Sequence, residues 1–249
     1  MLATIQYNTK KIKIDLSQPL DISIPITGKS TNVNAWYLEP PKIAPEVIDG
    51  ESVSVANGAV VNFNTITFNP HSHGTHTETV GHITEKVYSI NKQLKQFFFL
   101  AEVVTVAPEK LGDDYVISKK QLQFAIGNKK RDAIIIRTLP NTKEKKSRQY
   151  SNTNPTYLLE DAATYLKIKE VKHLLIDLPS VDKEQDGGAL LAHNAFWNTK
   201  GKLRLDATIT EFIYVSNKIE DGSYMLNLQI APFENDATPS KPILYKIIE

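Results

Sequence analysis

The sequence contains no cysteine. Disulfide bonds are therefore excluded, and so is catalysis by a thiol nucleophile. Any bound metal ion has to be held by nitrogen and oxygen ligands, because no thiolate is available. The usual mark of a secreted disulfide scaffold is also missing.

Long hydrophobic runs are missing as well. The longest candidate, residues 97–106, is interrupted by Glu102 and falls short of the roughly 20 apolar residues of a membrane-spanning helix. Residues 1–14 contain no uninterrupted apolar segment of the length found in a signal peptide. We therefore expect a cytoplasmic protein with no membrane partner.

Neither sign of charge is in excess. Lysine and arginine number 29 and aspartate and glutamate 28, which gives a net charge of +1. Proteins that bind nucleic acid carry a clustered basic excess, so we expect no nucleic-acid partner. The sequence also lacks a phosphate-cradling glycine loop, a dinucleotide-binding fingerprint and the G-x-S-x-G motif of many serine hydrolases.

What remains is the composition of a globular protein, with 249 residues, 41% of them hydrophobic. Apolar periodicity predicts strands over residues 11–16, 60–68, 97–106, 133–136, 171–178, 209–215 and 225–230, and helices over residues 118–125 and 154–166. The polar, Lys-rich segment 141–154 indicates a solvated surface loop, or else a flap beside an active site. Because no domain boundary is visible, we expect one α/β, β-rich domain over residues 1–249.

Four of the six histidines fall in one twelve-residue stretch that also holds a carboxylate: His71, His73, His76, Glu78 and His82. Imidazole is the commonest metal ligand and titrates near neutral pH. In an extended strand, side chains two apart share a face, so His76, Glu78 and His82 would lie together. Gly74 can supply a bend that brings His71 or His73 to that face. Such a set, with positions open for water, is typical of a catalytic metal site, whereas the bland alternative is a polar loop.

The run from Gly74 to His82 resembles the signature H-x-G-T-H-x-D-x-P-x-H of the cyclase-like metal-dependent hydrolases. That family includes bacterial kynurenine formamidase (arylformamidase) and isatin hydrolase. Further segments are similar to family segments in the same order: residues 15–20, 132–138 and 176–182.

The resemblance implies a swivelling β/β/α fold and assembly as a homodimer or higher homo-oligomer. It also implies one or two divalent ions, Zn or Mn, held by His71, His76, Glu78, His193 and Glu211. His82 would transfer protons, while a metal-activated water attacks a small-molecule amide. The expected substrate is an N-formyl arylamine such as N-formylkynurenine, or a cyclic amide.

Three departures from the family signature stand in this sequence. Glu78 replaces the usual aspartate, and Val80 replaces the usual proline. One extra residue precedes Gly74, so that Ser72 occupies the position of the first family histidine and either His71 or His73 takes its role. The Pro70-His71 step resembles the usual entry to the motif, which favours His71. His73 then supports the ligands, faces the substrate or is merely exposed.

Other residues keep two interpretations. Asp177 and Asp182 could support the metal site or cap turns, and Trp36 and Trp197 could line an aromatic substrate pocket or belong to the core. Without the resemblance, His193 would be interpreted as a buried structural histidine. Two alternative functions also stay open: a non-catalytic protein that uses a metal to hold an anionic ligand, and a lactonase or cyclase on the same fold.

Overall fold

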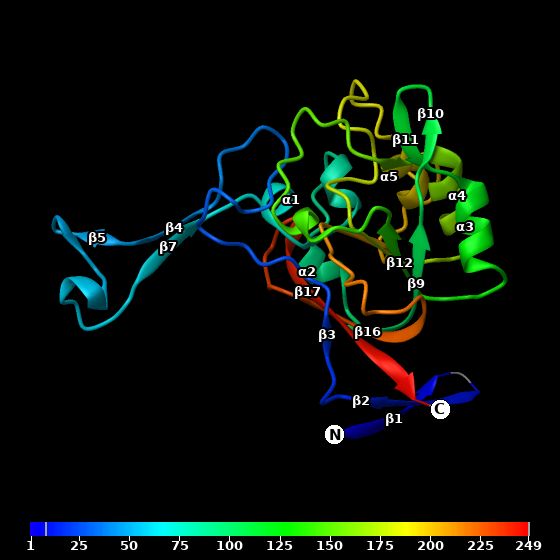
Figure 1. Cartoon of the computed structure of the whole chain (residues 1–249), viewed down its shortest axis with the longest axis horizontal. Helices are drawn as coiled ribbons and strands as arrows, with labels where there is room; N and C mark the ends of the chain where they lie inside the picture. The colour runs from blue at the N-terminus through cyan, green and yellow to red at the C-terminus, as the bar shows by residue number, and fades with distance from the viewer. Residues whose placement is uncertain (8, 249) are drawn as a thin grey trace.

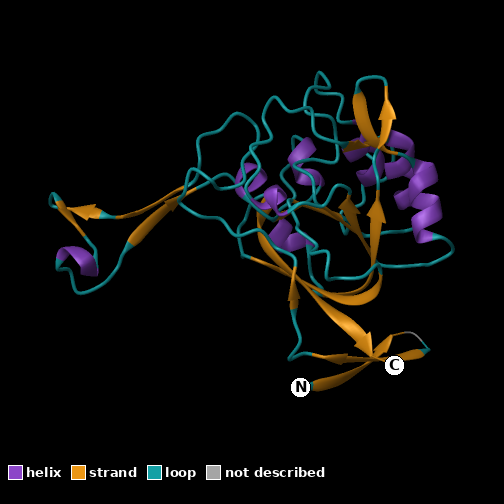
Figure 2. Ribbon diagram, in the orientation of Figure 1, coloured by secondary structure: helices purple, strands orange, loops and turns teal. Residues whose placement is uncertain are grey.

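Seven strands pair into a closed barrel. Figures 1 and 2 show strands at the centre of the molecule, with helices and loops around them. The computed structural model describes residues 1–7 and 9–248. Around the barrel the strands follow the order β17 (Ala237–Ile248), β16 (Gly222–Ile230), β9 (Phe98–Val106), β12 (Ala133–Thr138), β14 (His173–Ile176), β15 (Thr208–Glu211) and β8 (His76–Glu78). The short strand β8 closes the ring, because Thr77 pairs with Thr210 on one side and with Thr238 on the other.

The parallel half of the barrel consists of β9, β12, β14 and β15. β12 and β14 are buried along their whole length, which explains their continuous runs of isoleucine and leucine. Helices α3 (Lys119–Ile126), α4 (Glu160–Ile168) and α5 (Leu191–Trp197) lie on one side of the barrel (Figure 1). Ala162, Ala163 and Leu166 of α4 are part of the core beneath them. The prediction of a β-rich α/β fold is confirmed.

Most predicted elements are present, with corrections at their ends. The capping box at Ser118 and Gln121 starts α3 as predicted. The helix expected from residue 154 starts only at Glu160, because Tyr157 and Leu158 form strand β13 (Tyr157–Leu158), which pairs with β11 (Asp114–Ile117). The strand expected over residues 60–68 is shortened to β7 (Asn64–Thr67).

The remaining strands lie outside the barrel ring. β1 (Leu2–Tyr7) and β2 (Lys10–Asp15) form a hairpin on the end of β17, β3 (Leu20–Asp21) also pairs with β17, and β10 (Glu109–Leu111) pairs with β11. Because the first and last strands belong to one sheet, the structure agrees with one domain over residues 1–249, which stays a prediction. Among the described residues, no helix is long and apolar enough to cross a membrane.

Residues 42–68, called the arm below, project far from the barrel (Figure 1). They contain β4 (Lys42–Pro45), β5 (Val47–Ile48), β6 (Glu51–Ser52), the short 3-10 helix η1 (Val55–Asn57) and β7. β4 pairs with β7 and β5 with β6, so the arm is a two-stranded ribbon.

Residues 141–154, called the Lys-rich loop below, are less solvated than predicted. The loop contains the 3-10 helix η3 (Lys143–Lys146), in which Lys143 and Lys146 are exposed but Lys145 is buried. The Nζ atom of Lys145 lies 2.7 Å from a carboxylate oxygen of Asp177 and also donates to Thr138. The loop is therefore fixed to the barrel by a buried ion pair, and the prediction of a solvated segment is wrong for Lys145.

His173 gives the fold a specific sensitivity to acid. It is buried at the start of β14, with Nδ1 2.9 Å from the hydroxyl of Thr208 and its ring against Phe99. Burial, followed by the charge of Lys172, lowers the pKa of His173 to about 3. The ring stays neutral in the folded chain but gains a proton near pH 6.5 in the unfolded chain.

Stability is therefore lost as the pH falls through 6.5 towards 3, because the unfolded state then binds the extra proton. Between pH 7 and pH 4 we expect His173 to lower the free energy of unfolding by about 3 kcal/mol, because each pKa unit corresponds to about 1.4 kcal/mol. Urea unfolding of the wild type and of His173→Gln at both pH values measures this difference. Parallel pH dependences of the two proteins would contradict it.

Candidate metal centre

The side chains of the histidine stretch converge with residues from the second half of the chain around the carboxylate of Glu78. This carboxylate is fully buried at the end of β8. His193 Nε2 lies 3.1 Å from its Oε1, His71 Nδ1 3.1 Å from its Oε2, and His82 Nε2 3.9 Å from its Oε2. Three rings, two of them from the same short stretch, thus surround one buried acid.

Glu211 places a second buried carboxylate beside the first, from the neighbouring strand β15. Its Oε2 lies 3.4 Å from His76 Nε2, and its Oε1 lies 3.9 Å from His193 Nε2. The backbone N–H of Val181 donates to Oε1 and fixes the carboxylate. His193 therefore faces both carboxylates at once.

The outward nitrogen of each of three rings is held by an acceptor. His193 Nδ1 donates to Asp182 at 2.5 Å, His71 Nε2 to Asp236 at 2.8 Å, and His76 Nδ1 to the carbonyl of Gly74 at 3.1 Å. Because these oxygens only accept, each outward nitrogen carries a hydrogen. In a neutral ring the inward nitrogen then presents a lone pair, which is how metal-ligating histidines are oriented.

The buried carboxylates of this centre need positive charge near them, and either protonated rings or a bound cation can supply it. Burial lowers the pKa of His193, but hydrogen bonds to Asp182 and Glu78 raise it to about 10. Burial likewise opposes protonation of His71, and hydrogen bonds to Asp236 and Glu78 raise its pKa to about 10. The inward Nε2 of His76 is buried and makes no hydrogen bond within the described chain. A divalent cation fits these donors, because it would replace the protons and satisfy the lone pairs.

Two glycines let the motif pack closely enough to form the centre. A Cβ atom on Gly74 would lie 2.9 Å from Ile26 Cγ1 and 3.1 Å from the carbonyl of Ile24. A Cβ atom on Gly81 would lie 2.6 and 2.8 Å from the backbone N and O of Tyr88. Both glycines are therefore required by close approach of neighbouring chain.

The histidine stretch is extended only over β8 (His76–Glu78), which corrects the longer strand expected from sequence. The helix α1 (Pro70–His73), capped by Asn69, accommodates the extra residue and turns His71 toward Glu78. His73 is buried elsewhere, with Nδ1 accepting from the N–H of Asn69. After β8 the 3-10 helix η2 (Val80–Ile83) brings His82 back over Glu78.

A cavity of about 360 Å³ opens onto the rings. It is lined by Trp36, Leu38, Asn69, His71, Ser72, His82, Ser180, His193 and Glu211. Trp36 also donates from its indole N–H to the carbonyl of His71. A pocket of this size holds a small molecule.

Three further candidates lie behind the pocket wall. Asp182 accepts from two backbone N–H groups at the start of α5 as well as from His193, so it caps the helix and orients the ring. Trp197 is fully buried, donates to the carbonyl of Ala207 and packs against the His193 ring, which makes it core. Asp177 contacts Lys145 and Thr138 and lies outside the histidine cluster.

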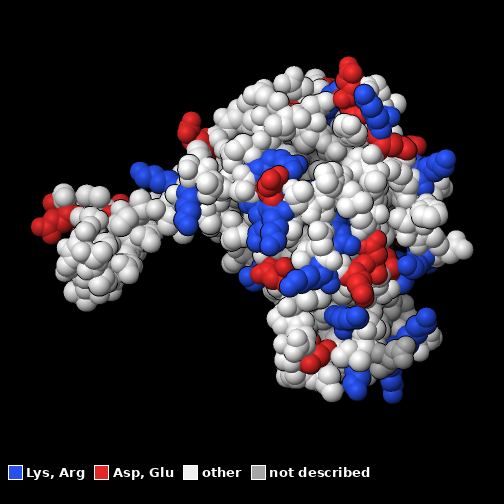
Figure 3. All heavy atoms as spheres, in the orientation of Figure 1, with Lys and Arg blue, Asp and Glu red and all other residues white. Residues whose placement is uncertain are grey.

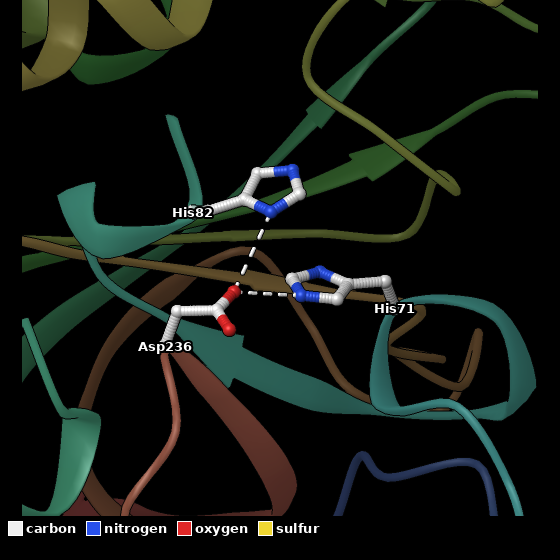
Figure 4. Close-up of side chains that lie close together, drawn as sticks. All are labelled: His71, His82 and Asp236. Atoms are coloured by element: carbon white, nitrogen blue, oxygen red, sulfur yellow. Dashed lines mark hydrogen bonds and ion pairs between the residues drawn. The ribbon is translucent and has the colours of Figure 1, made fainter. Parts of the chain in front are cut away.

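Asp236 is the residue that sequence reasoning missed. It precedes β17, and its Oδ2 lies 2.8 Å from His71 Nε2 and 3.5 Å from His82 Nδ1 (Figure 4). His82 stacks on His71 and is 32% exposed at the mouth of the pocket. The only signal in the sequence is a polar turn, Glu234-Asn235-Asp236, ahead of a strand.

Replacing Glu78 tests whether its charge holds a cation. We expect Glu78→Gln to reduce the metal content of protein purified without chelator to near zero, because the central anion is lost. Elemental analysis by mass spectrometry measures this. Glu102→Gln is the matched control, since Glu102 is a buried strand glutamate paired with Lys129 and Arg131. Equal metal content in both variants would refute the assignment.

Replacing Asp236 tests whether its hydrogen bond with His71 supports metal binding. We expect Asp236→Asn to keep the fold and to weaken metal affinity by about 10- to 100-fold, as for other partners of ligating histidines. Competition with a chromogenic chelator measures the affinity. Asp221→Asn is a control outside the centre, because Asp221 binds Arg137. An unchanged affinity in Asp236→Asn would show that the contact is incidental.

Comparison with known proteins matches this architecture. The sequence profile of the family described as "Putative cyclase" matches residues 14–183, more than half of the chain. Among curated proteins, no sequence matches significantly. Solved structures to which the chain is similar include the following three. One is described as a novel cyclase. It is 16% identical in sequence, with a TM-score of 0.67, and the alignment covers 94% of this chain and 90% of the cyclase chain. Another is a predicted metal-dependent hydrolase from Bacillus stearothermophilus. It is 17% identical, with a TM-score of 0.66, and the alignment covers 92% of this chain and 98% of the hydrolase chain.

The third, an isatin hydrolase bound to the product analogue thioisatinate, has 12% identity and a TM-score of 0.64, over 93% of both chains. At these identities the structural likeness shows the fold, whereas the profile match shows the family. The prediction of the swivelling β/β/α fold is confirmed by both. The chain belongs to the cyclase family.

Proposed function

We propose that this protein is a metal-dependent hydrolase that cleaves a small amide. The observation that carries the proposal is the orientation of three rings, two of them buried and that of His71 partly buried. His71, His76 and His193 each turn one nitrogen toward Glu78 or Glu211 while an acceptor holds the other. Such preorganised donors at the base of a pocket are what a catalytic ion needs.

The residues that would hold the ion or ions are His71, His76, Glu78, His193 and Glu211, with His82 beside them. The ligand atoms of His71, His76 and Glu78 lie within 4.8 Å of one another, and so do those of Glu78, His82 and His193. Glu211 borders both His76 and His193. Nitrogen and carboxylate donors without sulfur suit Zn or Mn. When bound, such an ion supplies Lewis acidity and lowers the pKa of a water molecule.

His82 is the proposed proton-transfer residue. Its Nε2 points toward Glu78, while Asp236 holds its Nδ1 side, so the ring is aimed from the mouth into the site. It would pass the proton of the attacking water to the leaving nitrogen as the C–N bond breaks. Water adds to the carbonyl carbon, so the products are a carboxylic acid and an amine, or one ring-opened acid from a cyclic amide.

The size and lining of the pocket support a small substrate. Trp36 and Leu38 give it an apolar wall, and Asn69 and Ser180 add polar groups that can orient a carbonyl. We therefore propose an N-formyl arylamine, such as N-formylkynurenine, or a cyclic amide. The location is proposed to be cytoplasmic, and the near balance of charge supports a small-molecule partner over nucleic acid.

The decisive variant is His82→Ala. We expect it to keep its metal and to lose about 10²- to 10⁴-fold in turnover, the typical contribution of a positioned proton-transfer group. The assay combines elemental analysis with a panel containing N-formylkynurenine, isatin, simple anilides and lactones. His173→Gln, a histidine variant outside the site, should retain wild-type turnover at neutral pH.

Three outcomes would change the assignment. Loss of metal in His82→Ala would make His82 a ligand. Turnover of lactones alone would favour a lactonase on the same fold. Metal-loaded wild type with no turnover in the panel would favour a protein that uses the metal to hold an anionic ligand.

A further inference from the structure

A second cavity, of about 460 Å³, lies between the Lys-rich loop and the carboxyl ends of two parallel strands. Thr138 is the last residue of β12, and Leu178 follows shortly after the end of β14; both residues line the cavity. Crevices at the carboxyl ends of parallel strands are where α/β sheets bind ligands. The cavity therefore has the position of a binding site.

This second cavity is separate from the pocket of the metal centre. Among the described residues, no side chain lines both, and residues 178–180 form their common wall, because Leu178 lines one and Ser180 the other. The N–H of Phe212 donates to the carbonyl of Leu178, and the Phe212 ring lies 5.7 Å from that of Tyr150 and 5.9 Å from that of His76, between centroids. The metal centre thus lies behind the wall of the second cavity.

Arg148 is a half-buried cation that lines this cavity. Its guanidinium lies 5.6 Å from the centroid of the Tyr150 ring and forms no ion pair with a carboxylate in residues 1–7 and 9–248. Glu144, the acid of the same loop, accepts from the hydroxyl of Thr142 and lies outside the cavity lining. A guanidinium presents five N–H donors in a planar fork that fits a carboxylate. Arg148 therefore brings uncompensated positive charge to the cavity.

Lys145 adds to the positive potential. Its ammonium group lines the cavity, whereas its partner Asp177 does not, so this ion pair presents its positive end. The carbonyl and hydroxyl of Thr138 and the carboxylate of Asp177 use all three ammonium hydrogens, which fixes the group in place. Burial lowers the pKa of Lys145, Asp177 opposes this shift, and the charges of Arg148 and Arg137 lower the pKa further. Positive charge is therefore concentrated beside the cavity.

The rest of the lining favours a ligand with an apolar part. Four apolar residues line the cavity: Leu139, Pro140, Pro155 and Leu178. Figure 3 shows lysine and arginine side chains gathered on the body of the molecule, where the Lys-rich loop lies in Figure 1. A matching ligand has one negatively charged group and a compact apolar body.

We propose that this cavity binds a small organic carboxylate, with the carboxylate group against the guanidinium of Arg148 and the apolar body against Leu139 and Leu178. The proposal goes beyond amide hydrolysis and does not depend on it, because these residues take no part in the metal centre. A neutral molecule of the same shape lacks the charge-assisted hydrogen bonds. Inorganic phosphate lacks the apolar body.

Calorimetric titration of protein purified without chelator, with 4-bromophenylacetate as the probe, tests the proposal. We expect saturable binding that is weakened about tenfold or more in Arg148→Gln, and equally for the neutral probe 2-(4-bromophenyl)ethanol, because each removes one of the two charges. Lys143→Gln is the matched control and should bind like the wild type, since Lys143 is an exposed cation of the same loop outside the cavity lining. Thr156→Trp fills the cavity without changing charge and should abolish binding. Thermal unfolding without the probe verifies that each variant is folded.

The position of the probe has to be observed directly, because a carboxylate can also bind a metal ion. Anomalous diffraction from crystals of the complex should locate the bromine beside Leu139 and Leu178. Bromine in the pocket of the metal centre alone, equal affinities of the wild type and Arg148→Gln, displacement by an equal concentration of inorganic phosphate, or no binding would each overturn the proposal. None of these measurements involves turnover, so their outcome is distinct from that of the proposed hydrolysis.

Discussion

The structure of the site depends on one constraint: the carboxylates of Glu78 and Glu211 are buried near each other, and their negative charges have to be balanced. Two neighbouring anions without water are unfavourable unless positive charge lies between or around them. The fold supplies imidazoles for this purpose, and it fixes each ring from behind through Asp182, Asp236 or the carbonyl of Gly74. Protons or a divalent cation can balance the anions, and the orientation of the rings suits the cation.

The short strands at the closure of the barrel position the residues of the site. β8 contributes His76 and Glu78 from only three residues, and it is held on both edges by β15 and β17. β15 brings Glu211 opposite His76 in register, and α5 contributes His193, which faces both carboxylates. Short strands at the closure of the barrel thus place side chains from three distant parts of the sequence within a few ångströms.

The metal-site motif and several elements of the fold could be predicted from the sequence, because local features of the chain determine them. The glycine and histidine spacing is local, and β12, β14 and α3 follow from apolar periodicity and a capping box. The tertiary contributions were not visible. Asp236 meets His71 only after β17 closes the barrel, and Trp197 resembles a pocket aromatic until its indole is seen to bind Ala207. The strand expected from residue 60 is short because those residues belong to the arm rather than to the core. The helical turn α1 in the histidine stretch could not be predicted from a strand pattern.

The position of Asp236 immediately before the last strand has a consequence for biosynthesis. A ribosome completes Glu78 long before it reaches residue 236, so the nascent chain carries this acid and the histidines near it through more than 150 further residues without the strand β17 that encloses them. The barrel ring and the outer contact of His71 are completed together, once residues 236–248 have been made. A chain that stops before residue 236 would lack the outer acceptor of His71 and would leave one edge of β8 without its β17 partner.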